Sequence, residues 1–209
     1  MEAFIRKVQS RTRALAVGAM PGLASPVWLH FRRFLAHPFR VKAVLPASKA
    51  WGALIASRVI RREGEFVVEL GAGTGAVTRA LLESGVPANQ LLVVEIDREM
   101  ADFLRAGFPA VHVIEGDAFA LARTMPPKIA GRTGTVVCGI ALASLSIAQQ
   151  RELISGIRTL LAPGGRLVVF SFVPFPPLPA ELLPLKRTGW ALTLRSFPPG
   201  FVWTYEMSE

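Results

Sequence analysis

The chain has 209 residues, of which 51% are hydrophobic and 19% charged, and its formal net charge is +9. The length suits one α/β catalytic domain with a modest extension, and the composition excludes a disordered or hydrophilic linker protein. A single cysteine, Cys138, excludes an intrachain disulfide and a metal cluster held by thiolates, so we expect a reducing cytoplasm and no metal.

The excess positive charge lies in the first part of the chain. Residues 1–62 hold twelve Lys or Arg and one acidic residue, which gives +11, whereas residues 63–209 hold twelve basic and fourteen acidic residues, which gives −2. This asymmetry indicates an anion-binding arm joined to a nearly neutral enzyme domain, and the anion could be a lipid headgroup layer or a nucleic acid. We therefore expect residues 1–62 to form a basic helical extension that associates with a membrane and covers the site. Residues 63–209 are expected to form the catalytic domain.

The N-terminal residues have the pattern of an interfacial helix. On a helix, the apolar side chains of residues 1–19 fall on one face with Lys and Arg on both flanks, and residues 27–35 interleave aromatic rings with arginines. Pro21 and Pro26 interrupt the stretch, which argues against a secretory signal or a spanning helix. We expect residues 1–35 to contact an anionic membrane surface, at the inner membrane face. Packing on the chain's own domain is the alternative.

From about residue 66, short apolar runs alternate with helical segments. This alternation predicts a Rossmann-like, doubly wound and mostly parallel sheet of seven strands with an antiparallel C-terminal strand. The last two strands, 190–197 and 201–207, are expected to pair around Pro198-Pro199-Gly200. The other predicted strands are Phe66–Leu70, Leu91–Ile96, Val111–Glu115, Thr135–Gly139 and Arg166–Phe172, with helices near 75–84, 98–106, 118–124 and 147–161.

A glycine-rich loop follows the first predicted strand. Glycines let the backbone turn sharply with positive φ and approach a ligand without a Cβ clash. The loop alone does not separate two kinds of cofactor, because it also satisfies the dinucleotide pattern G-x-G-x-x-A. Its sequence, with the two residues before it, is Glu69-Leu70-Gly71-Ala72-Gly73-Thr74-Gly75.

Carboxylates end the next two strands, where ligands bind in such sheets. Glu95 can accept two hydrogen bonds from a ribose diol, and Asp117 can accept one from the exocyclic amine of adenine. Capping of the next helix is the alternative for Asp117. Asp97 precedes a helix that begins at Arg98, so we expect it to act as that helix's cap.

Over roughly residues 64–173 the chain resembles the class I S-adenosylmethionine-dependent methyltransferases. The resemblance is carried by Val67–Gly75, by Glu95, by Gly116-Asp117 and by the turn Leu161–Gly165. It implies S-adenosylmethionine as donor, S-adenosylhomocysteine as product and no metal, whereas a nicotinamide dehydrogenase remains the alternative. The donor-binding residues so implied are Glu69, Gly71, Ala72, Gly73, Thr74, Gly75, Glu95, Ile96, Gly116, Asp117, Ala118 and Gly139.

The loop after the fourth strand bears on the methyl acceptor. Many class I enzymes that methylate adenine carry an Asn/Asp-Pro-Pro-Tyr-like tetrapeptide there, which holds a flipped base. Residues 138–145 contain no aromatic side chain, amide or carboxylate, which argues against nucleic acid as a partner. Ribosomal RNA adenine N6-methyltransferases and small-molecule methyltransferases remain alternatives.

A narrower resemblance is to the peripheral bacterial phospholipid N-methyltransferases of the PmtA type, which methylate phosphatidylethanolamine toward phosphatidylcholine. It is carried by the basic N-terminus, by Ala43–Ser48, by Gly139–Leu142 and by Phe197–Trp203. Ala47 departs from the usual Pro-Ser-Ser of that lead-in. The resemblance implies a phospholipid substrate; the number of methyl groups added and the oligomeric state stay open.

Four residues are candidates for handling the lipid headgroup. Arg40 and Lys42 carry charges that would attract its phosphate. Trp203 and Tyr205 could offer a π face to the methylated cation, with Tyr205 as the candidate catalytic residue. Packing within the sheet is the alternative for both rings.

Overall fold

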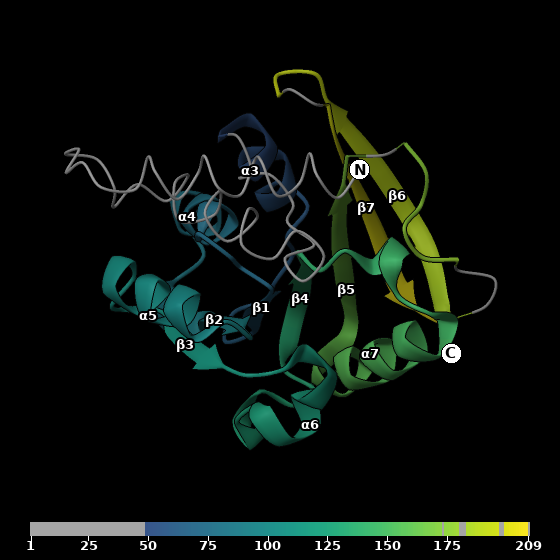
Figure 1. Ribbon diagram of the computed structural model, residues 1–209. Helices are drawn as coiled ribbons and strands as arrows, with labels where there is room; N and C mark the ends of the chain where they lie inside the picture. Colours follow the sequence, from purple (N-terminus) through teal and green to yellow (C-terminus); the bar gives the residue numbers. More distant parts are fainter. Residues whose placement is uncertain (1–48, 173, 180–182, 197–198, 209) are drawn as a thin grey trace, which may run out of the picture.

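The computed structural model describes residues 49–172, 174–179, 183–196 and 199–208. Its centre is a seven-stranded sheet in the order β3-β2-β1-β4-β5-β7-β6 (Figure 1). Strands β1 to β5 are parallel, and β7 runs antiparallel to both β5 and β6. The expected Rossmann-like fold with an antiparallel last strand is confirmed. The strands are β1 (Phe66–Leu70), β2 (Leu91–Glu95), β3 (His112–Glu115), β4 (Thr133–Cys138), β5 (Leu161–Ser171), β6 (Leu185–Thr193) and β7 (Gly200–Met207).

Helices cover both faces of the sheet. Because side chains alternate along a strand, Val67 and Val68 of β1 enter different hydrophobic clusters. Val67 packs with apolar side chains of α3 (Lys49–Ala56), α4 (Ala76–Glu83) and α5 (Arg98–Gly107). Val68 packs with those of α6 (Leu121–Thr124) and α7 (Ile147–Leu160). Short 3-10 turns complete the connections: η1 (Ala88–Gln90), η2 (Ala118–Ala120), η3 (Pro127–Ile129) and η4 (Leu142–Ser144).

Side-chain caps fix where two of the helices begin. The Asp97 carboxylate accepts a hydrogen bond from the Met100 N–H at 3.1 Å, which confirms the predicted cap of α5. Helix α7 begins with a capping box, in which Ser146 and Gln149 satisfy each other's backbone N–H groups. Both helices therefore start directly after the loops that follow β2 and β4.

The predicted bounds were wrong at the C-terminal pair. Strand β6 spans residues 185–193 rather than 190–197, and its side chains are mostly exposed. A strand at the edge of a sheet pairs on one side only and needs no continuous apolar run. Strand β5 likewise begins earlier than predicted, at Leu161, and the predicted helix 118–124 is divided between η2 and α6.

Helix α3 belongs to the packed core although it lies within the predicted extension. The Trp51 ring is fully buried, meets Phe170 edge-on at 5.2 Å and leaves no space for a Cβ at Gly200. Residues 1–48 lie outside the described residues, and with them the predicted membrane helix. The division between residues 62 and 63 stays a prediction. No helix within the described ranges has the length and apolarity needed to cross a membrane.

Candidate functional site

The glycine-rich loop lies at the carboxyl end of β1, between the ends of β2 and β4. Gly71, Gly73 and Gly75 have φ values of 73°, 54° and 77°, a left-handed conformation that side chains disfavour. A Cβ on Gly75 would also lie 2.5 Å from Cε2 of Phe108. Both the backbone conformation and the space around the loop therefore require glycine.

Backbone hydrogen bonds fix this loop to both neighbouring strands. The Gly71 N–H donates to the Val94 carbonyl at 2.8 Å, and the Gly139 N–H donates to the Leu70 carbonyl at 2.8 Å. A Cβ on Gly139 would lie only 2.6 Å from the Gly71 carbonyl oxygen. Gly139, which was predicted to bind the donor, is thus in direct contact with the loop.

Glu95 connects the glycine loop to the start of α5. Its Oε2 accepts a hydrogen bond from the Gly73 N–H at 2.9 Å, and its Oε1 accepts one from the Asp97 N–H at 3.1 Å. Each carboxylate oxygen can accept a further bond. The carboxylate is 7% exposed, so a ligand that reaches it makes hydrogen bonds with little competition from water.

Removal of the Glu95 carboxylate tests this geometry. Glu95→Ala should weaken binding of S-adenosylmethionine by about 1–3 kcal/mol, because it removes the predicted acceptor of the ribose hydroxyls. Isothermal titration calorimetry measures the change, and Asp102→Ala is the control because Asp102 is an exposed α5 carboxylate paired with Arg105. Equal donor affinity in the wild type and Glu95→Ala would show that the ribose binds elsewhere.

Glu69 is a buried carboxyl group at the end of β1. The Thr78 hydroxyl of α4 donates to its Oε2 at 2.7 Å. Burial raises the pKa of Glu69 from 4.5 to about 7, and the nearby Glu95 carboxylate adds to the rise, whereas the bond from Thr78 opposes it. Glu69 therefore changes its charge near neutral pH, where a cationic ligand would favour the ionised form.

The residues after β2 and β3 complete this end of the sheet. The Gly116 N–H donates to the Glu95 carbonyl at 3.0 Å, so the third-strand loop is joined to the second. Asp117 caps η2 by accepting a hydrogen bond from the Phe119 N–H at 2.9 Å, and Ala118 is buried. Ile96 is 70% exposed. The contact of Asp117 with adenine and that of Ile96 with the donor stay predictions.

The structure brings most of the predicted donor residues together. Ala72 is half-buried against the cluster beneath α4, and Thr74 is buried. Sequence reasoning missed two contributors: Thr78, which bonds Glu69, and Ile140, whose side chain packs beside Gly71. The signal for Thr78 was its place in the first turn of the helix after the loop, facing back toward β1. Ile140 follows directly on the predicted Gly139.

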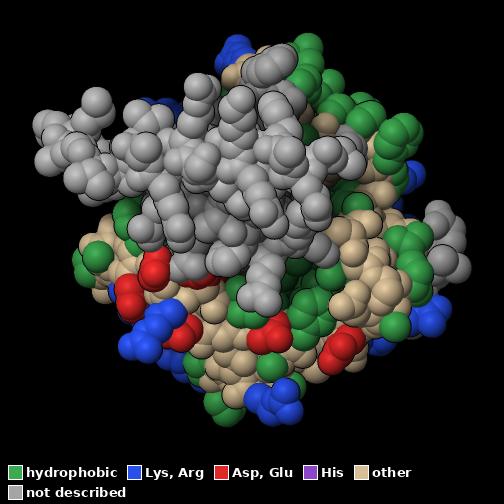
Figure 2. Space-filling model, in the orientation of Figure 1, with side chains coloured by type: hydrophobic (Ala, Val, Ile, Leu, Met, Phe, Trp, Pro, Cys, Tyr) green, Lys and Arg blue, Asp and Glu red, His purple; other side chains and the backbone are tan. Residues whose placement is uncertain are grey.

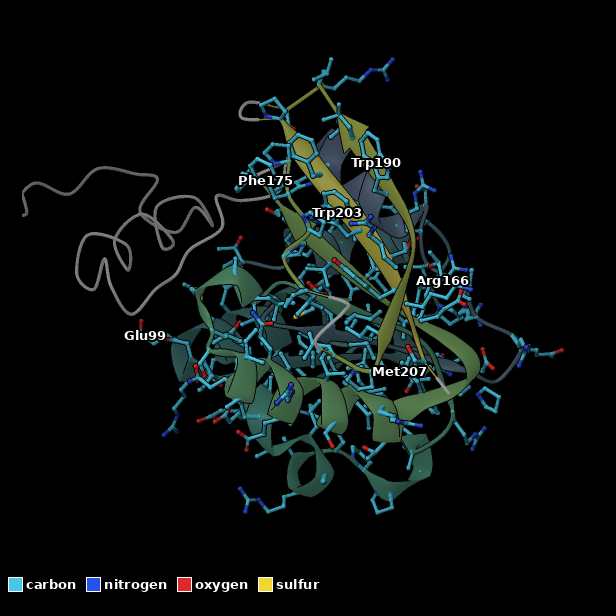
Figure 3. All side chains as sticks on the ribbon, turned by 90° about the vertical axis from the view of Figure 1, so that its right-hand side faces the viewer. Glu99, Arg166, Phe175, Trp190, Trp203 and Met207 are labelled. Atoms are coloured by element: carbon cyan, nitrogen blue, oxygen red, sulfur yellow. The ribbon has the colours of Figure 1, made fainter. Side chains whose placement is uncertain are left out.

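Two of the four predicted headgroup residues are described, and both lie in the core of the sheet. Trp203 and Tyr205 are buried in the cluster beneath α7, opposite Val169 and Leu167 of β5. The Trp203 ring stacks on Trp190 of β6 at 6.1 Å between centroids, and Figure 3 shows both rings on the paired strands. Arg40 and Lys42 lie outside the described residues. A role in substrate binding or catalysis stays a prediction for all four residues named in the sequence analysis.

Two observations concern metals and thiols. Within the described ranges, no group of three or more His, Cys, Asp or Glu side chains is arranged to hold a metal ion. Cys138 is buried at the end of β4, and burial raises the pKa of its thiol to about 12. Its side chain is part of the core beneath α7.

Comparison with known proteins identifies the kind of enzyme. Residues 67–165 match a family model described as a methyltransferase domain. The ornithine lipid N-methyltransferase of Singulisphaera acidiphila is 28% identical over 141 residues, which cover 66% of this chain and 73% of that protein. The ribosomal RNA small subunit methyltransferase A of Laribacter hongkongensis is 45% identical over 84 residues. That match covers 37% of this chain and only 31% of the relative.

Solved structures show the same fold. The glycopeptide N-methyltransferase MtfA complexed with S-adenosylmethionine has a TM-score of 0.58 and 16% identity, over 76% of this chain and 93% of that one. The CcbJ methyltransferase from Streptomyces caelestis has a TM-score of 0.58 and 19% identity, over 78% and 91%. The contacts of the glycine loop and Glu95 with the donor stay predictions. The match of residues 67–165 to a methyltransferase domain, together with the methyltransferase relatives and the shared fold, identifies the chain as an S-adenosylmethionine-dependent methyltransferase.

Proposed function

We propose that this methyltransferase transfers methyl groups to the amine of a lipid headgroup, with phosphatidylethanolamine and its methylated intermediates as acceptors toward phosphatidylcholine. The observation that carries the proposal is the similarity to an ornithine lipid N-methyltransferase over 73% of that protein's length. This match extends over more than twice the share of the relative that is matched in the ribosomal RNA enzyme. The narrower resemblance noted in the sequence supports the choice of a phospholipid.

The loop after β4 supports a lipid amine over a nucleic acid base. It holds only small and aliphatic side chains: Ile140 packs beside Gly71, and Leu142 is buried in the core beneath α7. Enzymes that act on a flipped base commonly stack it on an aromatic side chain. Residues 139–145 offer none.

Methyl transfer depends more on the positioning of donor and acceptor than on a reactive side chain. S-adenosylmethionine supplies a methyl group on a sulfonium, and the acceptor nitrogen must approach in line with a free lone pair. Glu69 places a group that ionises near pH 7 beside the glycine loop, and Glu95 is proposed to hold the ribose end of the donor. The acceptor ammonium must first lose a proton, directly or through water.

The membrane is the proposed partner of the N-terminal segment. Residues 1–35 join an apolar stripe to a high density of Lys and Arg, which favours binding at the cytoplasmic face of an anionic inner membrane. Arg40 and Lys42 follow directly and are proposed to bind the lipid phosphate. On this proposal the enzyme is cytoplasmic and peripheral.

Methylation of ribosomal RNA adenine is the second candidate. It is favoured by the 45% identity to the RNA enzyme of Laribacter hongkongensis over 84 residues. A match that covers 31% of a relative is compatible with a shared donor-binding half and a different acceptor.

A transfer assay with both acceptors separates the two candidates. The full chain is supplied with radiolabelled donor and with either phosphatidylethanolamine vesicles, with and without phosphatidylglycerol, or small ribosomal subunits. Gly75→Val is the inactive control, because its side chain has no space against Phe108. Label is expected in lipid, with more on the anionic vesicles. Label in RNA and none in lipid would replace the proposal with the second candidate.

A further inference from the structure

The outer edge of the β6–β7 pair carries an exposed apolar surface. Trp190, Leu192 and Leu194 alternate along β6 and just beyond it, so they share one face, and they are 59%, 40% and 75% exposed. Phe175, in the segment after β5, is 72% exposed. Figure 3 shows Phe175 and Trp190 at the same end of the β6–β7 pair, and Figure 2 shows hydrophobic side chains gathered there. These four residues are called the β6 patch below.

The charge next to the apolar end of β6 is positive. Arg195 is exposed directly beside Leu194, and no Asp or Glu occurs among the residues described at 174–179, 190–196 and 199–205. Lys186 and Arg187 are exposed at the other end of β6, where Lys186 lies opposite Glu206 of β7. An apolar surface with a cation at its border is complementary to a bilayer with anionic headgroups. Against a second copy of the same surface it would bring like charges together.

The strand register places the β6 patch near the carboxyl ends of the parallel strands, where the donor site is predicted. Five residues, one from each of five neighbouring strands, are paired in a row across the sheet, and the row ends at Trp190. Neighbouring strands are about 4.8 Å apart, so Trp190 lies roughly 19 Å from the end of β1, just before the glycine loop. Strand β6 runs in the direction of β1, so Leu192 and Leu194 extend past that level. The paired residues are Leu70, Cys138, Val169, Trp203 and Trp190.

We propose that the β6 patch docks the enzyme on a bilayer that contains anionic lipid. Trp190 lies at headgroup level, and Leu192 and Leu194 reach toward the acyl chains. When the β6 patch docks, the carboxyl ends of the parallel strands face the membrane, and the predicted donor site faces it with them. The inference rests on the proposed lipid acceptor for its choice of partner, and it adds a contact separate from residues 1–35.

Vesicle partitioning of the full chain tests the docking surface without any acceptor. Phosphatidylcholine vesicles are used with and without phosphatidylglycerol, and the test variant is Phe175→Ser combined with Leu194→Ser. Both side chains are more than two-thirds exposed and lie outside the strands, so thermal melting should match the wild type. The partition coefficient on anionic vesicles should fall by about tenfold or more. Ile60→Ser, an exposed apolar position outside the patch, is the matched control and should partition as the wild type does.

Two further variants sharpen the result. Trp190→Ser should also weaken partitioning, and Arg195→Gln should weaken it on anionic vesicles while leaving the neutral ones unchanged. Unchanged partitioning of the double variant would overturn the proposal. A change of oligomeric state with unchanged partitioning would do so as well, by showing that the patch is a subunit contact.

A soluble acceptor separates this inference from the proposed function. Short-chain phosphatidylethanolamine, kept below its micelle concentration, reports methyl transfer without a membrane. If the wild type methylates it and the double variant still binds vesicles normally, the docking surface fails and the lipid-acceptor function stands. If no lipid is methylated but the double variant loses vesicle binding, the function fails and the docking surface stands.

Discussion

Replacement of Gly139 by Ala is expected to damage the donor site and to lower the free energy of unfolding by about 1–3 kcal/mol. The new Cβ would lie 2.6 Å from the Gly71 carbonyl oxygen and 3.3 Å from that of Leu70. Both contacts are with backbone, which cannot move aside as a flexible side chain can. The ends of β1 and β4 must separate, which displaces the glycine loop and weakens the hydrogen bond from the Gly139 N–H to the Leu70 carbonyl.

Two measurements check the effect of Gly139→Ala. Urea denaturation gives the loss of stability, and calorimetry at a temperature where the variant is folded gives the donor affinity, which should fall by at least about tenfold. Gly107→Ala is the matched control, because nothing lies within 4 Å of a Cβ there. It should change stability by less than about 1 kcal/mol. If Gly139→Ala cost no more than Gly107→Ala, the close approach of the two loops would be contradicted.

Replacement of Glu69 by Gln is expected to remove a pH dependence of stability. Below a pH of about 4.5 the carboxyl is protonated in both the folded and the unfolded chain. As the pH rises toward 7 the unfolded chain ionises first, because burial has raised the folded-state pKa to about 7, so the free energy of unfolding falls. Relative to Gln, the wild type should lose about 2–3 kcal/mol of stability between pH 5 and pH 8.

The same substitution should also remove a pH dependence of donor binding, which in the wild type runs in the direction opposite to that of stability. A sulfonium beside Glu69 favours the carboxylate, so the donor affinity of the wild type should rise as the pH passes through about 7, and that of Glu69→Gln should not. Denaturation and calorimetry at several pH values measure both effects, with Glu83→Gln on the exposed surface of α4 as the control. A constant stability difference between Glu69→Gln and the wild type across this range would contradict the raised pKa.

The buried parallel strands could be predicted from the sequence. Strand β1 has the predicted bounds because its five buried residues end at a glycine that must adopt positive φ. Strand β6 was misplaced because the register with β7 sets its bounds, and Trp190 and Leu192 are exposed there. The alternation of Trp190, Leu192 and Leu194 indicates a strand but does not show where it begins or ends.

The donor site was predictable in outline, because it follows the order of strand ends along the chain. The contact of Glu95 with Gly73 and that of Gly139 with Gly71 depend on which strands are neighbours, which spacing alone does not give. The sequence spacing also does not show toward which face of the sheet the aromatic rings of β7 point. Trp203 and Tyr205 lie in the core beneath α7, within a strand that is buried on both sides.

Alkylation of Cys138 can report how often the centre of the sheet opens. Cys138 is the single cysteine of the chain, it lies at the level where β4 pairs with Leu70 and Val169, and its thiol is buried with a pKa of about 12. Alkylating reagents react with the thiolate, which this environment suppresses until the strands part. The rate of alkylation of the unmodified enzyme therefore measures how readily the strands around Cys138 separate, without any added probe.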